Sequence, residues 1–237
     1  MFYKSAHLYD AVYLNMGKDY AREAALVHDL ILKHKKSRGD HLLDIGCGTG
    51  LHLSHLNNDF QVEGLDIDTN MLKAAKKKYP DIPFHVGDMR GFSLDHKFDA
   101  IICLFSAIGY VRTIRLLNQT LTVIARHLVP GGVLIVEPWL SPEDWKTGKI
   151  HGLFVDQPDL KIARMNNSTR KGRISSFTFH YLVGTPRGIE HFTELHELGL
   201  FTKDEYLRSF QHAGLTVEHD PVGLDGRGLY IGNKAMD

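Results

Sequence analysis

Short apolar runs alternate along the chain with longer stretches in which apolar residues recur every three or four positions. Short runs are typical of strands buried on both faces, and the longer period is typical of helices that pack by one face. The predicted strands cover residues 42–45, 62–67, 84–86, 100–104, 133–137, 215–218 and 229–232, and the first long helix covers residues 19–34. This alternation predicts an α/β fold with one mostly parallel, seven-stranded sheet.

Local signals predict where the other helices begin and end. Asp68 is placed to cap a helix that Pro80 ends, and a capping box at residues 202–205 opens the last helix. Between them, a helix is predicted over residues 113–128. The Pro-Gly-Gly segment at residues 130–132 is expected to stop this helix before the next strand begins.

Residues 140–199 break this rhythm, because apolar and polar positions alternate there. Phe177 and Tyr181 fall on one face of an extended chain, and His180 falls on the other. Turn-forming residues at 184–188 would join two such strands into an antiparallel hairpin. We therefore expect an antiparallel β insertion after the fifth strand of the sheet, serving as a substrate-binding subdomain.

Composition narrows the range of partners. Lys and Arg together number 28, as do Asp and Glu, and this balance lacks the basic surface expected of proteins that bind nucleic acids or anionic membranes. No apolar run reaches the roughly 18 residues of a membrane helix, and the first residues lack the apolar core of a signal peptide. We expect residues 1–237 to form one cytoplasmic domain, monomeric or homodimeric, that acts on a small molecule without contacting nucleic acid or membrane.

The residue types that often carry disulfides or metals do not occur at the required spacing. Cys47 and Cys103 both lie in apolar, strand-like segments, so buried thiols are expected rather than a disulfide. The 15 histidines include no set at the spacing of a recognised metal site. No metal is therefore expected.

A glycine-rich turn at residues 43–50, with the sequence Leu-Asp-Ile-Gly-Cys-Gly-Thr-Gly, connects a predicted buried strand to a helix. Glycines in such a turn let the backbone approach a ligand and adopt positive φ without strain. Leu51 stands where a dinucleotide-binding fingerprint would place its third glycine, which disfavours a pyrophosphate cofactor. The chain also lacks a Walker phosphate loop, so neither of these two nucleotide sites is indicated.

Acidic side chains stand at the ends of the next two predicted strands: Asp66 lies in the last residues of one, and Asp88 follows the other. Asp66 can accept hydrogen bonds from both hydroxyls of a ribose, whereas the alternative role of helix cap suits Asp68 better. Asp88 can accept from the exocyclic amine of adenine, and Met89 offers a polarizable apolar edge. Because open α/β sheets bind ligands at the carboxyl ends of their strands, these residues and the glycine turn predict one nucleoside site.

Taken in order, these motifs resemble those of class I S-adenosylmethionine (SAM)-dependent methyltransferases. The matching segments are residues 44–50, 64–67, 87–90 and 128–132. Other segments resemble the N,N-dimethyltransferases that act on TDP-linked amino sugars such as desosamine, namely residues 9–20, 105–109, 137–139 and 226–229. The resemblance extends over nearly the whole chain, insertion included, and implies a Rossmann-like class I methyltransferase fold.

The resemblance also implies roles for individual residues. SAM, and its product S-adenosylhomocysteine, would be bound by Tyr13, Tyr20, Asp44, Gly46, Cys47, Gly48, Asp66, Ile67, Asp88, Met89 and Leu104. The acceptor would be contacted by Ser106, Trp139, Arg164, Arg170 and Arg227. The candidate catalytic residues are Tyr13, Tyr110 and His180, the last because it lies on the polar face of its predicted strand and can act as an acid or base. Purely structural roles remain open, since aromatic residues also pack helices and seal core edges, and most arginines and histidines are surface groups.

Two departures from the sugar-modifying family concern the acceptor. Tyr110 and Asn167 stand where that family is expected to have histidine, so another small amine or a hydroxyl is an alternative acceptor. A non-catalytic module that binds SAM as a structural or sensory ligand is the alternative from another class. The aromatic side chains of Tyr13, Tyr110 and Trp139 favour an enzyme with an acceptor cavity. The predicted reaction is transfer of a methyl group to an unprotonated amine held in line with the sulfonium.

Overall fold

The computed structural model describes residues 5–236. The larger sheet contains β1 (His41–Ile45), β2 (Gln61–Asp66), β3 (Phe84–Val86), β4 (Phe98–Cys103), β5 (Leu128–Val136), β10 (Leu215–Asp220) and β11 (Leu229–Lys234). The smaller sheet contains β6 (Ile150–Gln157), β7 (Leu160–Lys171), β8 (Ile174–Thr185) and β9 (Gly188–Gly199). The helices are α1 (Tyr9–Asn15), α2 (Tyr20–His34), α3 (Leu51–Leu56), α4 (Thr69–Lys78), α5 (Ile114–Arg126) and α6 (Lys203–His212), with a short 3-10 helix, η1 (Ala107–Val111).

The larger sheet has the strand order β10-β11-β5-β4-β1-β2-β3, and β11 is antiparallel to its neighbours. The other pairings are parallel. The four strands of the smaller sheet pair antiparallel in chain order, between β5 and α6. The predicted seven-stranded, mostly parallel sheet with an antiparallel insertion after its fifth strand is confirmed.

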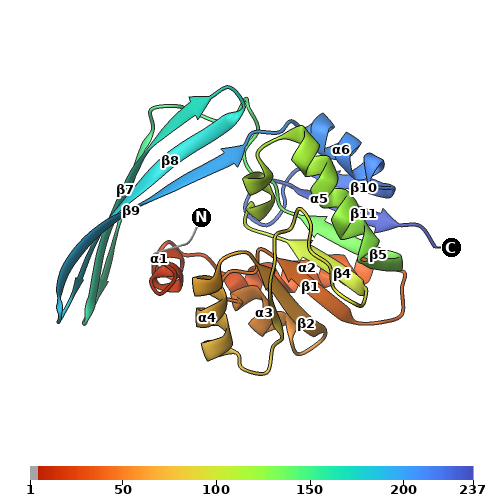
Figure 1. Ribbon diagram of the computed structural model, residues 1–237, viewed down its shortest axis with the longest axis horizontal. Helices are drawn as coiled ribbons and strands as arrows, with labels where there is room; N and C mark the ends of the chain where they lie inside the picture. Colours follow the sequence, from red (N-terminus) through yellow and green to blue (C-terminus); the bar gives the residue numbers. More distant parts are fainter. Residues whose placement is uncertain (1–4, 237) are drawn as a thin grey trace.

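Helices cover both faces of the larger sheet (Figure 1). On one face, α2, α3 and α4 bury Val27, Leu53 and Leu72 against the strands. On the other, α5 and α6 bury Leu121 and Phe210. Every residue of β4 is buried, as expected of a central strand covered on both faces. The two cores hold the sheet firmly, so the carboxyl ends of its strands form a well-defined edge.

The predicted helix caps are present. Asp68 accepts hydrogen bonds from the backbone N–H groups of Asn70 and Met71 at the start of α4. Thr202 and Glu205 form a complete capping box at the start of α6. Within residues 5–236, none of the helices combines the length and the apolar character needed to cross a bilayer.

One predicted helix boundary is wrong. The helix expected over residues 113–128 ends at Arg126, and β5 begins at Leu128, so the Pro-Gly-Gly segment at residues 130–132 lies inside β5. Leu128 pairs with Phe98 of β4, and the register shifts directly after this pair. Leu128 continues the helical spacing of the preceding apolar residues, although it is the first residue of β5. Spacing alone did not show this, because a buried leucine fits a helix and a strand equally well.

Two short elements, α1 and η1, were not predicted. In Figure 1 the smaller sheet projects from the α/β body, and α1 lies in the angle between them. Leu8 and Val12 are buried against Val155 and Ile162, so α1 packs on the inner face of the smaller sheet. With 7 and 5 residues, α1 and η1 are too short to show a clear helical period.

Candidate active site

The glycine-rich turn brings bare backbone to the carboxyl end of β1. Gly46 and Gly48 have positive φ angles of 75° and 55°. A Cβ on Gly46 would lie 2.6 Å from the Cβ of Ala107, so a larger residue does not fit without a shift of the neighbouring turn. A Cβ on Gly48 would meet no atom within 4 Å, because this residue borders open space. The backbone at Gly48 is therefore accessible to a ligand.

Asp66 ends β2 beside this turn. Its two carboxylate oxygens accept hydrogen bonds from the backbone N–H groups of Gly48 and Asp68, each at 2.8 Å. Burial raises the pKa of Asp66 above its ordinary value, although these backbone hydrogen bonds act against the rise. Since a carboxylate can accept about four hydrogen bonds, Asp66 keeps acceptor capacity for the hydroxyls of a ribose.

Asp88 and Met89 follow β3 at the next strand tip. The Asp88 carboxylate accepts a hydrogen bond from the backbone N–H of Arg90 and pairs with its guanidinium, which lowers the pKa of Asp88. Met89 and Ile67 present apolar surface to the same cavity, and Ile67 is 52% exposed. An ionised carboxylate beside apolar edges suits a planar base with an exocyclic amine.

These strand tips open into a cavity of about 650 Å³ that extends to the inner face of the smaller sheet. The predicted site residues that line it are Tyr13, Gly46, Gly48, Asp66, Ile67, Asp88, Met89, Leu104, Ser106, Tyr110, Trp139, Arg164 and Arg227. The volume is in the usual range for small-molecule sites, about 300 to 1,000 Å³. A nucleoside and an acceptor can therefore share one continuous hollow.

A smaller cavity of about 30 Å³ borders the same glycine turn. It is lined by Tyr20, Asp44 and Cys47, which were also expected to bind SAM. Burial and the nearby Asp66 raise the pKa of Asp44 to about 8, and burial raises the pKa of the Cys47 thiol. The Tyr20 hydroxyl is buried without a hydrogen-bond partner among residues 5–236. The Tyr20 hydroxyl is thus available to hydrogen-bond a ligand group that enters this small cavity.

The tip of β4 has a strained backbone. Phe105 and Ser106 have φ angles of 50° and 63°, which are uncommon for residues other than glycine. The Glu137 carboxylate accepts from the Phe105 N–H and pairs with Arg227 at 2.9 Å. Arg227 also donates to Ser106 Oγ at 2.6 Å. These contacts hold Ser106 and Arg227, two predicted acceptor contacts, at the floor of the cavity.

Arg164 enters the cavity from β7. Its guanidinium lies 4.3 Å from the ring centroid of Phe179 and 5.4 Å from that of Tyr13. Only 6% of Arg164 is exposed, and within residues 5–236 its Nη1 finds no hydrogen-bond partner and no carboxylate pairs with it. Burying a charge without a counter-charge is costly. An anionic group of a ligand would supply the missing partner.

Two predicted site residues, His180 and Arg170, line neither of these two cavities. His180 is exposed on the outer face of β8, where its ring stacks on His191. It points away because successive side chains of a strand alternate between faces. Arg170 is exposed, and its guanidinium donates to the carbonyl oxygens of Pro142 and Gly172. The structure does not bring these two side chains to the other site residues.

A histidine that the sequence pattern did not point to faces the cavity instead. His196 of β9 is buried, and its Nδ1 lies 2.7 Å from the hydroxyl oxygen of Tyr110. Its ring stacks on Phe177, with ring centroids 5.3 Å apart. Period-two alternation places His196 and Glu194 on one face of β9. Only the pairing of His196 with Phe177 shows that this face points inward.

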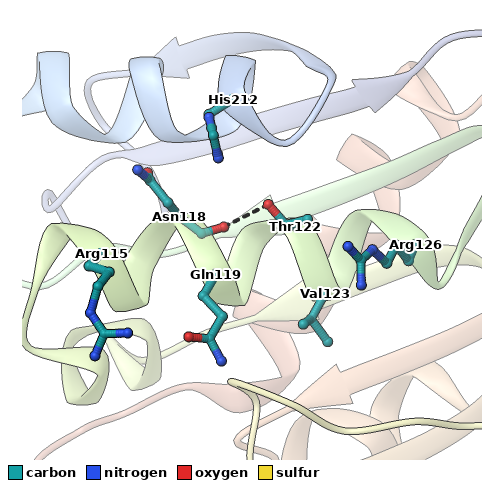
Figure 2. Close-up of a pocket in the computed structure, with 7 residues that line it drawn as sticks. All are labelled: Arg115, Asn118, Gln119, Thr122, Val123, Arg126 and His212. Carbon is teal, nitrogen blue, oxygen red and sulfur yellow. Dashed lines mark hydrogen bonds between the residues drawn. The ribbon is translucent and has the colours of Figure 1, made fainter.

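A third hollow, of about 350 Å³, lies between α5 and α6. Its lining, drawn in Figure 2, consists of Arg115, Asn118, Gln119, Thr122, Val123, Arg126 and His212. The hydrogen bond drawn there joins the Thr122 hydroxyl to the backbone carbonyl of Asn118 within α5. No strand tip contributes to this hollow, so it is separate from the candidate site.

Comparisons with known proteins agree with this geometry. A family model described as a methyltransferase domain matches residues 42–132. The chain is 43% identical to the dTDP-3-amino-3,6-dideoxy-alpha-D-glucopyranose N,N-dimethyltransferase of Streptomyces fradiae, over 96% of this chain and 89% of that relative. It is 40% identical to the dTDP-3-amino-3,4,6-trideoxy-alpha-D-glucopyranose N,N-dimethyltransferase of Streptomyces venezuelae, over 97% and 98%.

Solved structures give the same result. The crystal structure of Streptomyces venezuelae DesVI matches with a TM-score of 0.92 and 39% identity, covering 99% of this chain and 100% of that one. SAM-bound CalS10, an amino pentose methyltransferase from Micromonospora echinaspora, matches with a TM-score of 0.86 and 36% identity over 99% and 98%. The chain therefore belongs to the SAM-dependent methyltransferases, in the family of TDP-amino-sugar N,N-dimethyltransferases.

Proposed function

We propose that this enzyme methylates the amino group of a TDP-linked deoxyamino sugar. The observation that carries the proposal is Arg164, a buried guanidinium that lacks an acidic partner in residues 5–236 and lines the cavity next to the SAM residues. Guanidinium groups are well suited to phosphate oxygens, which a nucleoside diphosphate sugar supplies. The names of the relatives from Streptomyces fradiae and Streptomyces venezuelae support the same substrate class.

On the cofactor side, the three strand tips fit a nucleoside. Asp66 would accept hydrogen bonds from the ribose, the backbone at Gly48 would lie against it, and Asp88 and Met89 would border the adenine. When bound, SAM supplies a methyl group on a sulfonium, which an amine lone pair attacks while the C–S electron pair stays with sulfur. The enzyme's own task is to hold the amine in line and to remove its proton.

On the acceptor side, aromatic side chains form much of the wall. Trp139 donates a hydrogen bond from Nε1 to Ser175 Oγ at 2.9 Å, which fixes the orientation of its ring. Tyr13 meets the Phe105 ring edge to face, with centroids 4.9 Å apart. Tyr13 also faces the Arg164 guanidinium. We infer that Tyr13 lies near the reacting methyl group and that Trp139 contacts the sugar or its base.

The direct test is turnover. Purified protein is incubated with SAM and a panel of TDP-3-amino and TDP-4-amino deoxysugars, and mass spectrometry follows the addition of methyl groups. We expect methylation of at least one sugar and formation of S-adenosylhomocysteine. Transfer to a different small amine with no turnover of any sugar would reject the sugar assignment while leaving the methyltransferase activity in place.

A binding test examines Arg164 separately. Arg164→Met keeps much of the side-chain volume and removes the charge, so we expect the affinity for TDP to fall by about 10- to 100-fold. Affinity for SAM should change by less than about threefold, because the strand-tip residues are untouched. Arg187→Met, on the exposed hairpin turn between β8 and β9, is the matched control. Equal TDP affinity in both variants, measured by calorimetry, would remove the phosphate role of Arg164.

A further inference from the structure

Three side chains connect the cavity to the interior of the smaller sheet. Tyr110 lies on η1 at the cavity wall, with its hydroxyl oxygen 2.7 Å from Nδ1 of His196. The Nε2 of His196 faces Oε2 of Glu194 at 3.8 Å. Glu194 in turn accepts hydrogen bonds from the backbone N–H and the hydroxyl of Ser5, at 2.7 and 2.9 Å. A phenol, an imidazole and a carboxylate thus follow one another inward from the cavity.

The side chains of His196 and Glu194 are shielded from water. The side chains of His196 and Glu194 are each 4% exposed. His196 stacks on Phe177, and the Phe179 ring meets it at a steep angle with centroids 5.0 Å apart. Burial raises the pKa of Glu194, but the nearby His196 and the hydrogen bonds from Ser5 outweigh this effect, so the pKa falls below its ordinary value. Glu194 is therefore ionised at neutral pH.

An ionised Glu194 determines which ring nitrogen of His196 carries the hydrogen. The carboxylate favours the tautomer with hydrogen on Nε2, so that Nδ1 is free of hydrogen and can accept from the Tyr110 hydroxyl. The charged and titratable groups that face His196 are Tyr110 from η1, Glu194 from β9, and Arg164 of β7, which lies across the Phe179 ring. An imidazolium formed at His196 would have the Glu194 carboxylate as its counter-charge.

We propose that Tyr110 and His196 form the route by which the acceptor amine loses its proton. The proposal rests on the proposed function, because an amino sugar enters largely as an ammonium, which cannot attack a methyl group until it loses a proton. A phenol can take up that proton only if it passes on its own, and His196 is positioned to receive it.

One N–H bond of the ammonium breaks, the nitrogen keeps the electron pair, and the proton moves to the Tyr110 oxygen. The original Tyr110 proton moves to Nδ1 of His196, and Glu194 stabilises the imidazolium. When the methylated product leaves, the proton returns through Tyr110 to water in the open cavity. Tyr110 is thus the catalytic residue of this step, and Glu194 is a positioning residue behind His196.

The test compares kcat for wild type, Tyr110→Phe and His196→Gln across pH, with a TDP-amino sugar as acceptor. Near pH 7 we expect both variants to lose about 100-fold in kcat, within the range for removal of an acid or base catalyst. The loss should shrink as pH rises, because an amine already unprotonated in water needs no relay. His191→Gln, on the outer face of the same strand, is the control and should keep the wild-type profile.

The dissociation constant of SAM, expected within about threefold of wild type, reports whether each variant is folded. Glu194→Gln is a second variant, for which we expect a smaller loss of kcat and the same recovery at high pH.

Unchanged rates, or a loss of kcat that is constant at every pH, would overturn the relay, because a side chain that only shapes the cavity acts equally at all pH values. If wild type methylates no amino sugar at any pH, the proposed function fails and the relay fails with it. If wild type is active and the variants share its pH profile, the relay alone fails.

Discussion

Carboxylates in this enzyme differ in charge state because their neighbours differ. Asp88 pairs with Arg90, and this contact lowers its pKa. Asp44 is buried beside Asp66, and burial together with that like charge raises its pKa to about 8. Glu137 is also buried, which raises its pKa although Arg227 acts against the rise. The same functional group is therefore favoured as an anion after β3 and as a neutral group near the end of β1.

Asp66 and Asp68 provide a matched pair for testing the ribose site. Asp66→Ala should weaken SAM binding by about 1 to 3 kcal/mol, because a positioned acceptor at the cavity is lost. Asp68→Ala removes the cap of α4, so it should lower the free energy of unfolding by at least about 1 kcal/mol and leave SAM affinity within about threefold. Calorimetry and urea unfolding measure the two quantities. Equal SAM affinity for wild type and Asp66→Ala would contradict the ribose role.

Asp44 predicts a pH dependence of stability. Its pKa of about 8 in the folded protein exceeds that of an unfolded aspartate, so the stabilisation is complete below about pH 4 and is lost as pH rises through 8. Asp44→Asn stays neutral throughout. Its unfolding free energy relative to wild type should therefore increase by up to about 1.4 kcal/mol per pH unit between pH 4 and 8. The free energy of unfolding is measured against pH by urea unfolding without SAM. If its pH dependence is the same for wild type and Asp44→Asn, the raised pKa of Asp44 is refuted.

At the scale of elements, α1 joins the two sheets and carries cavity residues between them. Val12 is packed against the smaller sheet, and Tyr13 faces the cavity. Asp10 accepts a hydrogen bond from the Thr49 hydroxyl at 2.6 Å, which ties α1 to the glycine turn. The position of Tyr13 thus depends on contacts with both sheets.

Val12→Ala should loosen α1 more than the rest of the fold. The loss of two buried methyl groups costs about 1 to 2 kcal/mol, and a helix this short has little stability of its own. We expect faster hydrogen exchange in residues 9–15 and a higher KM for SAM. Hydrogen exchange in the rest of the chain should stay at the wild-type rate. Leu14→Ala is the control, since Leu14 is 54% exposed. Uniformly faster exchange over the whole chain would show instead that α1 is not a separate unit.

At the scale of the whole molecule, the cavity is completed only where the two sheets approach each other. Its floor comes from the strand tips of the larger sheet, and its far wall comes from the inner face of the smaller one. A ligand that fills it contacts both sheets and α1. Binding should therefore stabilise the fold as a unit rather than one sheet alone.

SAM should raise the melting temperature of the wild-type protein. At a concentration 100 times its Kd, a ligand that binds only the folded state adds about 2.7 kcal/mol, which corresponds to roughly 5 to 10 °C for a protein of this size. Differential scanning fluorimetry measures the shift. Asp66→Ala, tested at the same SAM concentration, should show a smaller shift, and an equal shift would argue against binding at the strand tips.

Much of the SAM side of the candidate site was predictable because it is local in the sequence. Gly46 and Gly48 lie in the turn after one predicted strand, Asp66 lies at the end of the next, and parallel strands end at one edge of a sheet. The acceptor side was less predictable, because part of its wall, including Arg164 and His196, comes from an insertion folded back over that edge. His180 and Arg170 were expected there on resemblance and on residue type, and the structure places both outside the cavity.

The sequence alone determined the strands of the larger sheet, the strand tips and the helix caps, since these follow from hydrophobic period, glycine conformation and capping chemistry within a few residues. Tertiary structure decided which face of the insertion points inward. Alternation shows that a strand has two faces, but the packing of α1 and the pairing of β8 with β9 turned the aromatic face toward the cavity. That choice put His196, rather than His180, beside Tyr110, because the side of a sheet that is covered depends on residues far away in the chain.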